Sequence, residues 1–213
     1  MFEALLSLYF MIAATSQAQE PPVAPPAINA AAPVLQIKGK DGVVFDQADL
    51  AKNPNIVIAG NGYALFDRDP KIWGEPVIDK SDDSVGFSCS SKQCGDGFDL
   101  DISKTEYTDD GKTLTHDQWL KAMTTIGPKT KPVVTGKSKV TFPNPGRIVS
   151  VSREKAALIE SRIVFSNGKV WSGFSLNFPR DPFYVRVAVT GPLKLRDKVR
   201  AMVFETVKRV KVP

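Results

Sequence analysis

Apolar and polar residues alternate most regularly in the last third of the chain. The alternation predicts one strand at residues 159–165 and a second at residues 170–178, joined by a turn at residues 166–169. Asn167 and Gly168 in the turn are the pair that type I′ hairpin turns favour. On the second strand, Phe174, Leu176 and Phe178 recur at every second position and therefore share one face. We expect an antiparallel hairpin with an apolar face.

A further strand and a helix are predicted after a turn at residues 179–182. Over residues 183–190, apolar side chains alternate with mainly polar ones, which is typical of a half-buried strand. Gly191 and Pro192 then open a segment with the 3.6-residue period of a helix. Its apolar stripe consists of Leu195, Val199, Met202, Val203, Thr206 and Val210. A helix with one such stripe packs on a sheet, so we expect a C-terminal amphipathic helix against this one.

The middle of the chain contains a helix start and an acidic strand. Thr115 and Gln118 have the spacing of a capping box at the start of a short helix. Residues 98–102 alternate between apolar residues and aspartates. This alternation predicts a strand on which Asp99 and Asp101 form an exposed acidic face.

The order of the elements indicates the fold class. Residues 55–59 and 63–66 are predicted short strands, and the helix, the antiparallel strands and the last helix follow them. We expect a single α+β domain over residues 35–213, with a mostly antiparallel sheet and helices packed on it as an α-β-α sandwich.

The N-terminus has the pattern of a secretory signal. Residues 4–14 form an uncharged, mostly apolar run, and residues 16–18 place small residues at the −3 and −1 positions of a cleavage site. This run is too short to cross a hydrocarbon core of about 30 Å, so we expect no transmembrane helix in the mature form. Residues 1–3 contain no Lys or Arg. A buried N-terminal helix therefore stays open as the alternative.

The segment after the cleavage site is rich in Pro and Ala, which favour extended conformations over packed elements. The sequence thus predicts a signal peptide at residues 1–18, a tether at 19–34 that begins with Gln19, and the domain. We expect a periplasmic or secreted protein.

Two cysteines, Cys89 and Cys94, are separated by four residues. In an oxidising compartment they are expected to form a disulfide, and the spacing differs from that of a C-x-x-C redox motif. If the four residues form a hairpin loop, the cysteines face each other at the two strand ends.

The net charge of +5 is distributed unevenly along the 213 residues. Residues 129–213 contain 18 Lys and Arg against 5 Asp and Glu, whereas residues 1–128 are acidic. The two halves either attract each other within one fold, or the basic part contacts an anionic partner such as lipid or polysaccharide. The candidate face for such a partner consists of Lys194, Lys198, Arg200, Lys208 and Arg209. The helix dipole is sufficient to account for the last two.

No cofactor motif is complete, and we expect no bound cofactor. Residues 60–62 lack the third glycine of a dinucleotide fingerprint, and residues 136–138 lack the first glycine of a P-loop. Nucleic-acid signatures are absent as well, and export argues against a nucleic-acid partner. The one histidine, His116, follows the helix cap and is expected to be exposed.

Acidic residues offer two alternatives to a plain binding module. Positions 1, 3, 5, 6 and 12 of an EF-hand-like loop are occupied by Glu106, Thr108, Asp110, Gly111 and Asp117. Carboxylates that could act as a catalytic pair are Asp96, Asp99, Asp101, Asp109 and Asp110. A calcium-dependent interaction protein and a carboxylate-dependent hydrolase therefore both stay open, without an assignable catalytic or metal site.

Three stretches resemble the PsbP-like superfamily, over roughly residues 60–212. They are residues 62–73, which include a Pro-x-x-Trp element, residues 114–123, and residues 184–210. The resemblance implies an α-β-α sandwich that acts as a non-enzymatic binding or assembly module, with no shared catalytic residue. We therefore expect a non-enzymatic periplasmic or secreted module whose partner is a protein or an anionic surface.

Overall fold

The computed structural model describes most of the chain from residue 55 onward, together with two short strands before it. The described residues are 37–38, 44–45, 55–59, 63–79, 84–89, 91–95, 97–106, 108–109, 112–180 and 183–211. The predicted signal peptide, its cleavage before Gln19 and the tether lie outside them, as do residues 60–62. None of the described helices has the length and apolar character needed to cross a membrane.

Within the described residues, the main sheet has nine strands, all paired antiparallel. Its order is β10-β11-β13-β14-β15-β7-β6-β5, and β12 also pairs with β13. The bounds are β5 Val77–Asp79, β6 Ser84–Ser88, β7 Asp99–Glu106, β10 Val133–Thr135, β11 Ser138–Thr141, β12 Arg147–Val151, β13 Glu154–Phe165, β14 Val170–Arg180 and β15 Phe183–Pro192. The predicted hairpin of residues 159–178 is confirmed as the centre of this sheet.

Smaller elements surround the main sheet. The remaining strands are β1 Ile37–Lys38, β2 Val44–Phe45, β3 Ile56–Ala59, β4 Ala64–Asp67, β8 Thr108–Asp109, β9 Lys112–Thr113 and β16 Val210–Lys211. The helices are α3 His116–Thr124 and α4 Arg196–Val207, and the 3-10 turns are η2 Lys92–Cys94 and η3 Leu193–Leu195. The predicted strands at 55–59 and 63–66 are confirmed as the antiparallel pair β3–β4, which β16 extends.

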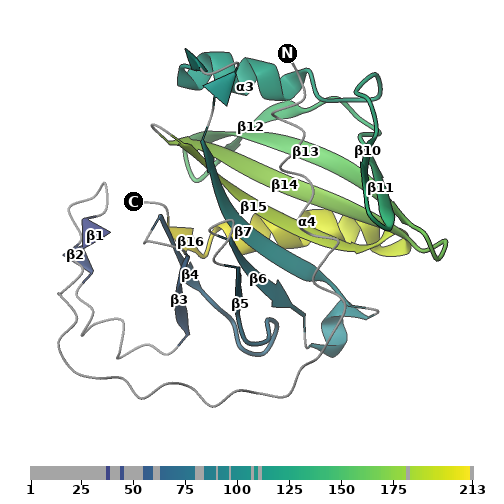
Figure 1. The fold of residues 1–213 in the computed structure, drawn as a ribbon. Coiled ribbons are helices and arrows are strands. Elements are labelled where there is room, and N and C mark those ends of the chain that lie inside the picture. The colour runs from purple at the N-terminus through teal and green to yellow at the C-terminus, as the bar shows by residue number, and fades with distance from the viewer. Residues whose placement is uncertain are drawn as a thin grey trace.

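Helices α3 and α4 cover opposite faces of the main sheet (Figure 1). Because side chains alternate across a strand, Leu158 points into the core under α4, while Ala157 and Ile159 point into the core under α3. We call these two sides of the sheet the α4 face and the α3 face. The predicted α+β fold, with its antiparallel sheet and C-terminal helix, is confirmed.

The start of α3 is stabilised by the predicted capping box. The backbone N–H of Gln118 donates to Thr115 Oγ1 at 3.3 Å, and the N–H of Thr115 donates to Gln118 Oε1 at 2.9 Å. The first turn presents Trp119 to the sheet, where it is fully buried and lies 4.6 Å from the Tyr184 ring. The cap therefore fixes where the helix begins, and the tryptophan fixes where it docks.

The prediction of a half-buried strand at residues 183–190 is wrong. Both faces of β15 are buried, including Tyr184, Arg186, Ala188 and Thr190. The reason is the position of the strand. β15 lies between β14 and β7 in the middle of the sheet, where a hydrophobic core packs against each face.

The end of the chain also differs from the prediction. Residues 191 and 192 still belong to β15, so α4 begins only at Arg196, after η3. Val199, Val203 and Thr206 are buried as predicted, but Val210 lies in β16 and not in the helix. Pro179 and Arg180, predicted as part of a turn, are the last residues of β14.

The disulfide between Cys89 and Cys94 is present, with a Cα–Cα distance of 6.3 Å. The two cysteines do not face each other across strand ends, because the β6–β7 connection is longer than four residues. The backbone N–H of Cys89 donates to the carbonyl oxygen of Phe98, the residue before β7, whereas Cys94 lies in η2. The bridge therefore closes a turn inside the connection and ties it to the buried side of the sheet.

Candidate functional site

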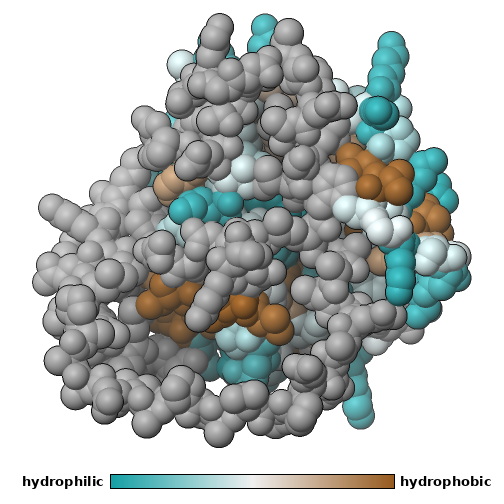
Figure 2. Space-filling view, in the orientation of Figure 1, coloured by the Kyte–Doolittle hydropathy of each residue, from teal (hydrophilic) through white to brown (hydrophobic). Residues whose placement is uncertain are grey.

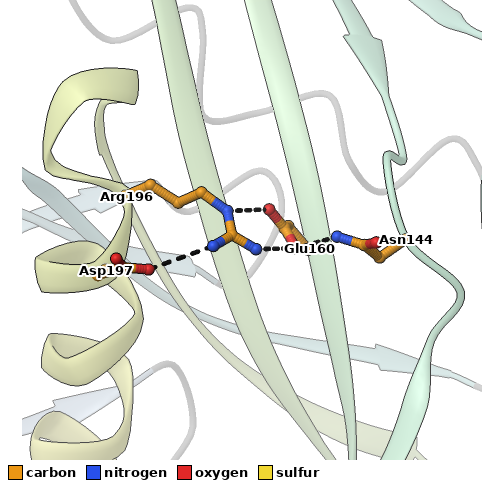
Figure 3. Close-up of polar contacts among 4 residues, drawn as sticks. All are labelled: Asn144, Glu160, Arg196 and Asp197. Atoms are coloured by element: carbon orange, nitrogen blue, oxygen red, sulfur yellow. Dashed lines mark hydrogen bonds and ion pairs between the residues drawn. The ribbon is translucent and has the colours of Figure 1, made fainter.

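A buried carboxylate at the edge of α4 lies at the centre of a cluster of four polar residues. Glu160 lies on β13 with its side chain 9% exposed. Arg196 donates from Nε to Glu160 Oε1 at 2.5 Å and from Nη2 to Oε2 at 2.8 Å. Asn144 donates from Nδ2 to the same Oε2 at 2.6 Å (Figure 3). Both carboxylate oxygens are thus satisfied by donors from two other parts of the chain.

The fold places Arg196 over the sheet by ending β15 in η3. Arg196 is the first residue of α4, and its guanidinium lies 5.4 Å from the centre of the Phe174 ring. Phe174 is directly opposite Glu160 in the β13–β14 register, so the arginine crosses the ring to reach the carboxylate. Its Nη1 also lies 3.2 Å from the exposed Asp197 (Figure 3).

The electrostatics favour the ionised pair. Burial opposes ionisation of Glu160, but the hydrogen bonds from Arg196 and Asn144 and the charges of Arg196 and Arg147 outweigh it. They hold the pKa of Glu160 below its ordinary value. The hydrogen bond to Glu160 likewise raises the pKa of Arg196. The pair is therefore fully charged at neutral pH.

Further cations lie on the same face of the sheet around this pair. Residues directly opposite each other in an antiparallel ladder share a face. Arg147 is opposite Leu158, and Lys139 is opposite Val164, so both share the α4 face with Glu160. Arg162 follows two positions after Glu160 on β13 and shares its face by the strand period.

Helix α4 adds one more cation to this side. Arg200 follows Arg196 by four residues and so lies on the same side of the helix. We call these five residues, Lys139, Arg147, Arg162, Arg196 and Arg200, the basic strip. Four of them are exposed, and among the described residues no ion pair neutralises Lys139, Arg147, Arg162 or Arg200. The strip can therefore attract an anion larger than the one carboxylate that it surrounds.

The residues of the predicted C-terminal basic face differ in whether they form ion pairs within the molecule. Lys194, Lys198, Arg200, Lys208 and Arg209 are all exposed. Lys208 pairs with Glu205 at 2.7 Å, and Arg209 pairs with Asp69 at 3.6 Å. The two residues at the end of the helix are thus engaged within the molecule.

The strand members of the basic strip were missed by the sequence reasoning. The excess of Lys and Arg over residues 129–213 was the available signal. It could not show which of those cations share a face, because that depends on the pairing of β11, β12 and β13.

A second polar cluster lies on the α3 face, where an exposed acidic strand was predicted. Asp101 lies 3.4 Å from Arg186 and accepts from Ser103 at 3.0 Å, while Asp99 accepts from Ser88 at 2.9 Å. Both aspartates are partly buried, so the prediction of an exposed acidic face is wrong. Burial raises the pKa of Asp99, and the bond from Ser88 offsets this only in part.

This cluster holds two carboxylates with unlike surroundings. Asp101 is held by the buried Arg186, which is the ordinary arrangement of a structural ion pair. His116 is exposed in the first turn of α3, as predicted. Of the other predicted acidic residues, Asp96 and Asp110 lie outside the described residues.

The EF-hand-like segment folds as a hairpin. Thr108 and Asp109 pair with Thr113 and Lys112 as the strands β8 and β9. In the part of the chain that the structure describes, no group of three or more His, Cys, Asp or Glu residues is placed to hold a metal ion.

Comparisons with known proteins find the fold only at a distance. No family model and no curated protein matches the chain. A crystal structure from Bacteroides thetaiotaomicron shares 11% identity with a TM-score of 0.48, over 75% of this chain and 48% of that one, so the chain spans about half its length. The solution structure of cyanobacterial PsbP from Synechocystis sp. PCC 6803 shares 13% identity with a TM-score of 0.47, over 74% of this chain and 91% of that one.

A structure of the protein Mog1 is similar at 10% identity and a TM-score of 0.39, over 74% of this chain and 94% of that one. A PsbP structure, from the family that the sequence resembles, is thus among these distant likenesses. Likenesses this distant concern the fold alone, and the function is argued from the side chains.

Proposed function

We propose that the chain is a non-catalytic binding module that docks on an anionic partner through the basic strip. The observation that carries this proposal is the grouping of five cations on one face, around a single buried carboxylate. Exposed ion pairs stabilise a fold by only about 0–1 kcal/mol, and four of these cations have no such pair. These cations therefore add little to the stability of the fold, whereas together on one face they can attract an anionic partner.

The proposed location is outside the cytoplasm, in the periplasm or as a secreted protein. The disulfide at Cys89 and Cys94 supports it, because disulfides persist mainly in oxidising compartments. The signal-like residues 1–18 support it as well. Intact-mass measurement of the exported product tests the location: a mass that starts at Gln19 is expected, and a mass that retains residues 1–18 contradicts the proposed signal.

Retention on a heparin column tests the basic strip. The double variant Lys139→Glu/Arg162→Glu reverses two charges of the strip. The matched control, Lys121→Glu/Lys129→Glu, reverses two exposed lysines on or next to α3 and changes the net charge by the same amount. We expect the strip variant to elute at much lower salt than the wild type and the control to elute close to it. Equal shifts for both variants would show that only net charge matters, and the proposal would fail.

A further inference from the structure

A mainly apolar row lies beside the basic strip on the same face of the sheet; Val134 at its end is exposed, and Val164 and Val170 are half-buried. Val134 is opposite Lys139, Lys139 is opposite Val164, and Val164 is opposite Val170. These four residues form one row across β10, β11, β13 and β14, on the α4 face. Val134 is 68% exposed on the edge strand β10.

A leucine from η3 belongs to the same end of the sheet. Pro192, the residue before η3, is opposite Trp171, and Trp171 is next to Val170. Leu193 then opens η3 with 36% of its surface exposed. In Figure 1, α4 begins at the end of the sheet where β10 and β11 lie. Figure 2 shows hydrophobic surface at that end. We call Val134, Val164, Val170 and Leu193 the apolar rim.

The combination of strip and rim distinguishes between kinds of anionic partner. A hydrated polysaccharide offers charge but no apolar layer, so exposed valine and leucine would gain nothing from it. The surface of a bilayer offers both, with phosphates at the headgroup level and hydrocarbon directly below. Lys and Arg side chains can reach the phosphates while neighbouring apolar side chains enter the boundary.

We infer that the partner of the basic strip is the surface of an anionic lipid bilayer, into which the apolar rim inserts. This inference rests on the proposed function and names its partner. Each Lys or Arg near an anionic membrane increases binding by roughly fivefold. Removing the burial of one large aliphatic side chain decreases binding by roughly tenfold.

Co-sedimentation with vesicles tests the inference. The vesicles contain phosphatidylglycerol mixed with phosphatidylcholine, or phosphatidylcholine alone, and are used at low and at high salt. The rim variant is Val134→Ser/Leu193→Ser. The matched control is Val77→Ser/Ile78→Ser, which removes two residues of 61% and 57% exposure from β5 at the opposite edge of the sheet.

We expect the wild type to bind the anionic vesicles, more strongly at low salt, and the rim variant to bind them at least tenfold less. Both serine variants should elute from heparin like the wild type, because their charges are unchanged. Two results would overturn the inference that the partner is a bilayer while leaving the proposed function intact. One is a wild type that is retained on heparin but does not bind anionic vesicles. The other is a rim variant that binds the vesicles as strongly as the control variant does. If the charge-reversed strip variant also behaves like the wild type on heparin, the proposed function itself fails.

Discussion

Replacing Glu160 with Gln removes the buried negative charge at the centre of the basic strip while preserving the size of the side chain. The carboxylate accepts two hydrogen bonds from Arg196 and one from Asn144. A hydrogen bond to a charged group contributes about 1.5–3 kcal/mol net. Because Arg196 is 39% exposed and can be solvated in the variant, we expect the lower part of this range. The predicted loss is about 2 kcal/mol, or about 4–8 °C in Tm for a domain of this size.

The predicted loss depends on pH with a definite sign. The pKa of Glu160 is lower in the folded protein than its ordinary value of 4.5. A group of this kind stabilises the fold fully above its unfolded pKa, and the contribution disappears as the pH falls through the folded pKa. The difference in unfolding free energy between the wild type and Glu160→Gln should therefore be full near neutral pH. It should shrink below pH 4.5.

Urea unfolding over a series of pH values measures this difference. Glu205→Gln is the matched control, since its partner Lys208 is 60% exposed and Glu205 is 69% exposed. A pair this exposed contributes at most about 0.5 kcal/mol. A loss in Glu160→Gln that is as large in acid as at neutral pH, or no loss at all, would refute the ion-pair reasoning. The same variant should also be retained longer on heparin, because the strip gains one net positive charge.

Three further predictions concern the scaffold around the site. Replacing Cys89 and Cys94 together with Ser should cost about 2 kcal/mol in urea unfolding, since the bridge closes a short loop, and a wild type that shows two free thiols on titration would contradict it. Thr115→Ala should lower stability by about 1 kcal/mol through loss of the cap of α3, whereas Thr115→Ser should retain most of it. Gly191→Ala should cost about 1–3 kcal/mol, because the added Cβ would lie within 2.7 Å of a Phe98 ring carbon, and an unchanged Tm would show that the ring can move.

Local patterns in the sequence were sufficient for several of the elements and for the helix cap. The hairpin of β13 and β14, the β3–β4 pair and the capping box at Thr115 all depend on residues that are close in the chain. Their signals are the alternation of side chains and the spacing of cap residues, which are read over fewer than ten positions. The same signals could not show that Arg186 is buried, because burial of the second face of β15 depends on layers contributed by other segments.

The sequence by itself therefore determined the antiparallel α+β fold, the cysteine pair and the excess of positive charge after residue 129. Only the tertiary structure decided which of those charges act together. Glu160 and Arg196 are 36 residues apart and meet because η3 turns α4 back across Phe174. Arg147 and Lys139 join them because β12 and β11 both pair with β13. Strand register and helix docking depend on how whole faces of the sheet and helices pack together. They involve residues far apart in the chain, so the local spacing of residues does not encode them.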